Sequence, residues 1–192
     1  MPKGQYHFPE GEEKLQDTAT ESAVGSPPYY LGRSWTTEEF QSWIKTHQLP
    51  VTDPVIAKIV NYIRVTYDDD VKIGGVGYCF GGRHVFRLMG SGVIVVGVVN
   101  HPSFFTMEEV QKLGTGKKLA IFATEKDDIL PPAKRRATQD VLTREGATWM
   151  STVFSGSEHG FSVRGDLNVK EVRFAKEKLL KELWNGLMIG YE

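Results

Sequence analysis

The residue with the clearest capacity for chemistry is the one cysteine of the chain, Cys79, which lies in the run GYCFGG at residues 77–82. Glycines two positions before and after a nucleophile permit a tight turn from strand to helix that exposes the reactive side chain. A thiol at a helix N-terminus favours the thiolate, because the helix dipole lowers its pKa. The same turn predicts that the backbone N–H of Phe80 points at a developing oxyanion. The alternative is a structural cysteine, since free cysteines are often small core residues.

Two later loops carry the residue types that would activate such a nucleophile. Asp127 and Asp128 follow an apolar run, and His159 lies between glycines in the run GSEHGF at 156–161. Taken alone, each loop is more typical of a solvated surface, and spacing does not identify which aspartate points inward. Together they give nucleophile, acid and histidine in the chain order of the α/β-hydrolase triad, each after a predicted strand.

Other polar residues near these loops are weaker candidates. Arg83, Arg87 and Arg164 are cations that could hold a substrate carboxylate, although such arginines are more often solvated. His84 is expected to pack on the helix after the turn and His101 to lie in a turn, and neither is assigned a catalytic role.

The sequence contains no recognisable motif for binding a cofactor or a metal. A single cysteine excludes an internal disulfide and a cysteine-based zinc cluster. The sequence has no phosphate loop, no dinucleotide fingerprint and no metal-ligand spacing, so we expect neither a cofactor nor a metal.

Alternating strand and helix patterns predict the elements that position these loops. Four apolar runs are expected as strands, at residues 71–77, 93–99, 119–123 and 149–154. Helical patterns follow them, at residues 80–89, 107–113, 132–145 and 168–187. This alternation predicts an α/β fold, a parallel sheet covered on both faces, with active residues at the carboxyl ends of the strands. The last helix is expected to pack through Phe174, Leu179, Leu180, Leu183 and Trp184.

The region before the first strand has a different composition. Residues 1–34 are rich in Gly, Pro, Ser, Thr and Glu and are interpreted as a flexible segment, which assigns the α/β domain to residues 35–192. Thr36 and Glu39 have capping-box spacing and predict the start of one helix. Asp53-Pro54 predicts the start of a second, which continues to about Tyr67.

Charge and hydropathy exclude several classes of protein. The 192 residues carry a formal net charge of -1 and suit one domain. This balance, without a basic run, argues against a nucleic-acid binder. No apolar stretch reaches the roughly 18–20 residues of a membrane helix, and the N-terminus lacks the apolar core of a signal peptide. We therefore expect a cytoplasmic protein.

Four motifs occur together in the chain: GYCFGG, the run NHPSFF at 100–105, the run TEKDDILP at 124–131 and the run GSEHGFSVRGD at 156–166. Together they resemble the dienelactone hydrolase family, most closely its fungal branch. The resemblance extends from about Trp35 to the C-terminus. It implies an α/β-hydrolase fold and an enzyme that cleaves a lactone or small ester through a thioester acyl-enzyme. It further implies Cys79 as nucleophile, His159 as base and Asp127 as acid, because the family's acid stands four residues before a proline, here Pro131.

The resemblance also implies strands that this sequence does not show. The family has several strands and a helix before the nucleophile strand, whereas the roughly 70 residues here suggest a tail and two helices. The family's upstream part carries the second oxyanion N–H and an acidic residue that contacts the cysteine. Without it, residues 71–77 form an unpaired apolar edge, to be covered by the N-terminal segment, a second copy in a homo-oligomer, or another pairing. The sequence thus permits an ester or lactone hydrolase, a repurposed biosynthetic enzyme, or an inactive binding module.

Overall fold

The computed structural model describes residues 37–67 and 70–189, and only the backbone of residues 37 and 183–189. The segment 1–34, predicted to be flexible, lies outside the described residues, and so does Thr36 of the predicted capping box. The chain divides into two compact units, Met1–Val71 and Lys72–Glu192. Each unit is described by itself.

The first unit contains two helices, α2 (Thr37–Thr46) and α3 (Leu49–Tyr67). The predicted start of the second helix at Asp53 is wrong, because α3 begins four residues earlier. The backbone N–H groups of Val51 and Thr52 donate to the carbonyl of Gln48, which closes the first turn there. Pro54 therefore lies inside α3, where a proline removes one backbone hydrogen bond without ending the helix.

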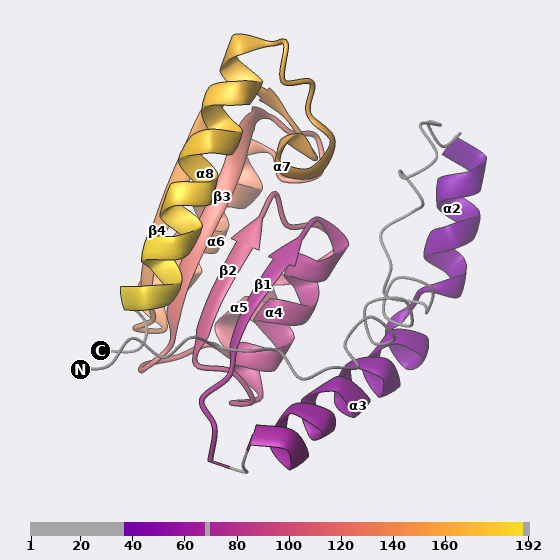
Figure 1. The fold of residues 1–192 in the computed structure, drawn as a ribbon, viewed down its shortest axis with the longest axis vertical. Helices are drawn as coiled ribbons and strands as arrows, with labels where there is room; N and C mark the ends of the chain where they lie inside the picture. Colours follow the sequence, from indigo (N-terminus) through magenta and orange to yellow (C-terminus); the bar gives the residue numbers. More distant parts are fainter. Residues whose placement is uncertain (1–36, 68–69, 190–192) are drawn as a thin grey trace. The chain divides into compact units, whose positions relative to one another are not determined.

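The second unit is built on four parallel strands in sequence order (Figure 1). They are β1 (Gly74–Tyr78), β2 (Val96–Asn100), β3 (Lys118–Lys126) and β4 (Thr148–Glu158). The predicted α/β class and the four strands are confirmed, but the first two strands start three residues later than expected. For β2 the cause is visible, because the N–H groups of Val93 and Ile94 donate to the carbonyl of Leu88 and belong to the turn after a helix.

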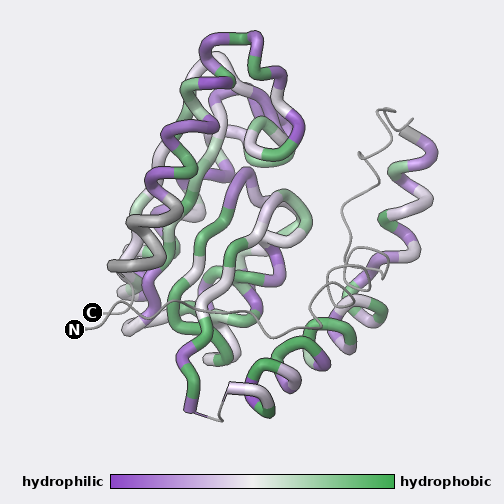
Figure 2. The backbone as a smooth tube through the Cα atoms, viewed as in Figure 1, coloured by the Kyte–Doolittle hydropathy of each residue, from purple (hydrophilic) through white to green (hydrophobic). Residues whose placement is uncertain are grey.

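Helices cover both faces of this sheet (Figure 1). One face carries α4 (Phe80–Gly90), α5 (Met107–Gln111) and α6 (Pro132–Arg144), and the other α7 (Phe161–Arg164) and α8 (Lys170–Ile189). All five residues of β2 are buried. Val99 packs in the core beneath α4 and Val98 in the core beneath α8. A parallel strand covered on both faces is mainly apolar. Figure 2 shows this along β2, whose last residue, Asn100, is polar.

The packing face of α8 differs from the predicted one. Ala175 and Leu179 are buried in the core with Phe122 and Phe154, because residues four apart lie on one side of a helix. Phe174 and Leu180 were expected on that face, but they are 65% and 66% exposed. The side chains of Leu183 and Trp184 lie outside the described residues.

The strand β1 ends the sheet. Among the described residues no strand pairs with its outer side, and Val76 and Tyr78 are 40% and 38% exposed. The described residues thus agree with the predicted free edge. In the part of the chain that the structure describes, every helix is too short or too polar to cross a membrane.

Candidate active site

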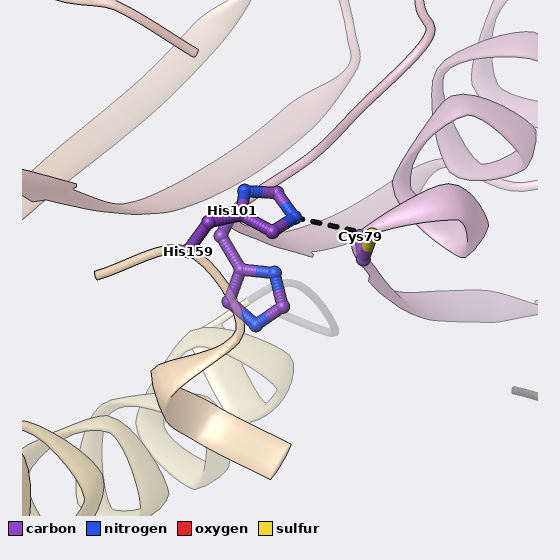
Figure 3. Close-up of side chains that lie close together, drawn as sticks. All are labelled: Cys79, His101 and His159. Carbon is purple, nitrogen blue, oxygen red and sulfur yellow. Dashed lines mark hydrogen bonds between the residues drawn. The ribbon is translucent and has the colours of Figure 1, made fainter. Parts of the chain in front are cut away.

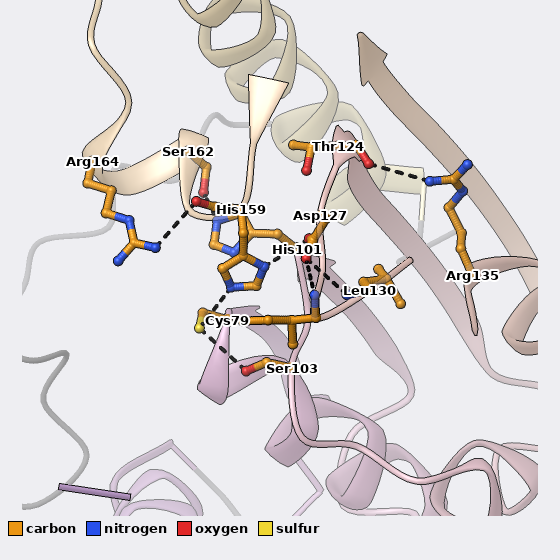
Figure 4. Close-up of polar contacts among 11 residues, drawn as sticks. Cys79, His101, Ser103, Thr124, Asp127, Leu130, Arg135, His159, Ser162 and Arg164 are labelled. Carbon is orange, nitrogen blue, oxygen red and sulfur yellow. Dashed lines mark hydrogen bonds and ion pairs between the residues drawn. The ribbon is translucent and has the colours of Figure 1, made fainter. Parts of the chain in front are cut away.

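The carboxyl ends of all four strands contribute to one cluster of polar side chains (Figure 4). Each strand is followed directly by one of these residues: β1 by Cys79, β2 by His101, β3 by Asp127 and β4 by His159. Parallel strands end at the same edge of a sheet, so residues up to 80 positions apart meet there.

The turn that carries Cys79 has a strained backbone. Cys79 adopts φ 48° and ψ −113°, which is rare for a residue with a side chain. A Cβ on Gly77 would lie 2.5 Å from the carbonyl oxygen of Gly81, and one on Gly82 would lie 2.6 Å from Cβ of Pro102. A Cβ on Gly81 would meet nothing within 4 Å. Close backbone approach therefore requires glycine at 77 and 82, whereas the sequence pattern suggested 77 and 81.

A line of hydrogen bonds connects three of the predicted site residues. His159 Nε2 lies 3.1 Å from Cys79 Sγ, and His159 Nδ1 lies 2.8 Å from Asp127 Oδ2. Such a line is the geometry in which an acid orients a histidine and the histidine exchanges a proton with a nucleophile.

The loop after β3 distinguishes the two aspartates that spacing left open. Asp127 is buried and its Oδ1 accepts the backbone N–H groups of Ile129 and Leu130, each at 2.9 Å. Its other oxygen is thereby directed at His159. Asp128 is exposed. The structure thus brings Asp127, rather than Asp128, to the histidine.

The environment favours the charged forms of Cys79 and His159. Burial raises the pKa of Cys79, but the imidazoles of His101 and His159 and the hydroxyl of Ser103 outweigh it and lower the pKa to about 5. Burial lowers the pKa of His159, but its hydrogen bonds to Asp127 and Cys79 raise the pKa to about 9. Between these values the pair is a thiolate and an imidazolium.

A second loop packs against the cysteine turn. The hydroxyl of Ser103 lies 3.4 Å from Cys79 Sγ, and the N–H of Ser103 donates to the carbonyl of Cys79 at 3.0 Å. In the same loop His101 and Phe104 have φ values of 38° and 58°. The run NHPSFF therefore holds a strained conformation that supports the nucleophile turn.

His101 is the residue that sequence reasoning missed. It is completely buried, and its ring lies 4.8 Å from that of His159, edge to face. Its Nε2 lies 2.5 Å from Oγ of Ser162, while its Nδ1 has no hydrogen-bond partner among the described residues. One signal could have found it: His101 comes two residues after a predicted strand, and the other site residues likewise come within five residues after one.

The remaining candidates lie around this cluster. Arg83 Nε donates to both carboxylate oxygens of Glu109, at 3.0 and 3.1 Å. That ion pair engages the guanidinium that Arg83 would offer a substrate carboxylate. Arg164 is exposed and its Nη2 lies 3.4 Å from the carbonyl oxygen of His159. Phe80 is the first residue of α4, a position whose N–H points out of the helix end.

Comparisons with known proteins bear on the family and the fold of the chain. The family model described as "Dienelactone hydrolase family" matches residues 32–187. The chain is 36% identical over 140 residues to hydrolase pyvD of Aspergillus violaceofuscus, covering 73% of this chain and 56% of that protein. It is 38% identical over 141 residues to hydrolase tropI of Talaromyces stipitatus, covering 73% and 54%. The chain thus spans about half the length of these curated relatives.

A solved structure supports the same fold at low identity. The crystal structure of a candidate dienelactone hydrolase from Klebsiella pneumoniae superposes with a TM-score of 0.63 at 12% identity. The match covers 79% of this chain and 68% of that chain. It bears on architecture alone and agrees with the parallel sheet described above.

Proposed function

Since the chain belongs to the dienelactone hydrolase family, we propose that it hydrolyses a lactone or small ester by acyl transfer to Cys79. The unbroken line from Asp127 through His159 to Cys79 carries this proposal. Cys79 is the nucleophile, His159 the acid and base, and Asp127 the group that orients the imidazole and stabilises its charge.

In the first half of the reaction the Cys79 thiolate attacks the carbonyl carbon. The electron pair of the C=O bond moves to oxygen, and the backbone N–H of Phe80 donates to that oxyanion. The carbon–oxygen bond of the ester then breaks, and the His159 imidazolium gives its proton to the departing oxygen. The product of this half is a thioester on Cys79 and an alcohol or enol, which stays tethered when the substrate is a lactone.

In the second half, water cleaves the thioester. Neutral His159 takes a proton from water while the water oxygen attacks the thioester carbon. The carbon–sulfur bond breaks, and its electron pair returns to Cys79 as the thiolate. The acid is released and the thiolate–imidazolium pair is restored. Arg164, exposed beside His159, is the candidate to hold a substrate carboxylate.

An inactive or repurposed relative is the competing function, and one observation favours it. Among the described residues no strand precedes β1, so a second oxyanion donor from upstream strands is not identified. Loss of one such donor costs on the order of 10²–10³ in turnover. A weakened enzyme and an inactive module are therefore the alternatives to separate.

Burst kinetics with an activated aryl ester test the proposal. We expect release of one equivalent of phenol per chain, followed by slow turnover, and an acyl group on the peptide that contains Cys79 by mass spectrometry. Cys79→Ala should abolish both signals. A wild-type chain that is folded but gives neither burst nor acylated peptide would rule out nucleophilic catalysis and favour the binding module.

We also propose that a second copy of the chain covers the free edge of β1. An edge strand exposes unpaired N–H and C=O groups, which readily template pairing with another strand. Val76 and Tyr78 on this strand are 40% and 38% exposed, so apolar surface would be buried as well.

A further inference from the structure

Three side chains at the carboxyl edge of the sheet form a donor set of the kind that binds soft divalent metals (Figure 3). One ligand atom each from Cys79, His101 and His159 lies within 4.8 Å of the other two. We propose that these residues form a binding site for zinc, and that an ion bound there reversibly blocks the nucleophile. The proposal extends beyond ester hydrolysis, because binding can be measured without any substrate.

The chemistry of the donors suits zinc. Zinc prefers thiolate and imidazole ligands, with bonds of about 2.3 Å to sulfur and about 2.0–2.1 Å to nitrogen. At tetrahedral angles these bond lengths put neighbouring ligand atoms about 3.3–3.6 Å apart. The 3.1 Å between Cys79 Sγ and His159 Nε2 is already near that spacing. The third ligand atom needs a side-chain adjustment on the order of 1 Å to join them.

The surroundings of His101 suit it to be the third ligand. It is completely buried, and Ser162 Oγ engages its Nε2 at 2.5 Å, which leaves Nδ1 as its ligand atom. That Nδ1 has no hydrogen-bond partner in the described part of the chain. A buried polar atom without a partner is costly, and coordination to a metal would compensate it.

Each of the three ligands also has an outer partner that fixes it. Asp127 accepts from the far nitrogen of His159, Ser162 contacts the far nitrogen of His101, and Ser103 lies 3.4 Å from Cys79 Sγ. Metal-binding histidines typically have such second contacts, which set the tautomer and orient the ring. The cluster therefore has an ordered ligand shell and leaves a fourth position for water.

Occupancy and catalysis exclude each other at this site. A zinc ion would accept the electron pair of the Cys79 thiolate that otherwise attacks the carbonyl, and the Nε2 lone pair of His159 that otherwise takes a proton from water. Binding also releases the Nε2 proton of the His159 imidazolium to solvent. No bond to carbon or sulfur breaks, so removing the ion and returning that proton restores both groups. We infer that free zinc inhibits the enzyme and that a chelator restores its activity.

Cobalt, used as a spectroscopic substitute for zinc, tests the ligand set directly. Titration of the full chain with Co²⁺ should saturate at one ion per chain, with a thiolate-to-cobalt charge-transfer band in the near ultraviolet. Cys79→Ser should remove the band. His101→Phe should weaken binding by more than the roughly 10–100-fold that loss of an outer partner costs. Ser162→Ala should fall within that range, and His47→Ala, outside the cluster, should bind like the wild type.

Other results would overturn the proposal. Equal affinity in the wild type and a folded His101→Phe variant would leave an ordinary cysteine–histidine pair without a third ligand. Binding lost in His47→Ala would place the ion elsewhere. If His101→Phe does not fold, X-ray absorption of the zinc-loaded wild type decides, since one sulfur and two imidazoles are expected and fewer imidazoles contradict the site. Failure of these tests leaves the acyl burst unaffected, so the two proposals fail separately.

Discussion

Cys79 and His159 stabilise opposite charges on each other, and this predicts the pH dependence of the thiol. With a chelator present, the rate of alkylation by iodoacetamide should rise around pH 5 and stay level to about pH 9. The sign follows from the lowered pKa of Cys79, because thiolate accumulates only above that value. His159→Ala removes the imidazolium and should move the midpoint upward, toward the roughly 8.5 of a free cysteine. A wild-type midpoint already near 8.5 would contradict the ion pair.

Hydrolysis should show a narrower pH range than alkylation. Catalysis needs both the thiolate and the imidazolium proton, so turnover should rise through about pH 5 and fall through about pH 9. Alkylation needs the thiolate alone and should not fall at the upper end. Initial rates with an activated ester, corrected for its spontaneous hydrolysis, check the falling limb. Turnover that keeps rising above pH 9 would exclude His159 as the proton donor.

The two neighbouring aspartates offer a matched pair of variants. Asp127→Asn removes the charge that faces His159 Nδ1 at 2.8 Å, and kcat/KM should fall on the order of 10²–10⁴. Asp128→Asn changes an exposed side chain and should alter the rate less than about twofold. Rates of thioester formation and hydrolysis measured on both variants make the comparison. Equal losses in the two variants would remove the special role of Asp127.

Residue types and order were enough to select Cys79 and His159 from the sequence, and the family resemblance added Asp127. The pairing of Arg83 with Glu109 was not predictable, because it joins residues 26 positions apart across packed helices. His101 was missed for another reason. Its chemistry depends on a buried environment that only the folded loops create.

At the scale of elements, the turn between β1 and α4 depends on Gly77 more than on Gly81. Gly77→Ala would put a Cβ 2.5 Å from a backbone carbonyl, so the turn must open, with a loss of roughly 1–3 kcal/mol of stability and of the acyl burst. Gly81→Ala meets nothing within 4 Å and should be neutral or slightly stabilising in a helix. Thermal unfolding and burst amplitude of the two variants test this. Two equally damaged variants would show that the close approach is not what constrains the turn.

Element types were predictable here, while several element ends were not. Apolar runs and helical periods gave the four strands and the helices between them, because a sheet buried on both faces leaves that pattern. The first and last residues of these elements depended on backbone hydrogen bonds, which the residue types do not predict. Gln48 closes the start of α3, and Leu88 draws Val93 and Ile94 into a turn. The orientation of α8 likewise did not follow from its composition, because the helix packs on the sheet through Ala175 and Leu179 and so exposes other apolar residues.

At the scale of the whole molecule, the sheet has two outer strands with similarly exposed valines. Val76 on β1 is 40% exposed and Val153 on β4 is 42% exposed. If a second copy pairs along β1, Val76→Lys should place a charge in that interface and convert a dimer to monomers, as charged edge strands do. Val153→Lys should leave the dimer unchanged. Sedimentation velocity of the two variants and the wild type measures the difference.

Hydrogen exchange in β1 distinguishes pairing between copies from another cover. In a dimer, the β1 amides directed away from β2 should exchange slowly and become fast in the Val76→Lys monomer, because the partner strand that accepts them is gone. If the wild type is a monomer and these amides are still slow, a segment of the same chain covers the edge. A monomer with fast β1 amides would instead mean that the edge is open in solution. That outcome would contradict the dimer and leave Cys79 at the end of an unpaired outer strand. The burst amplitude of the same sample would then show whether the chain acylates Cys79 without a cover on that strand.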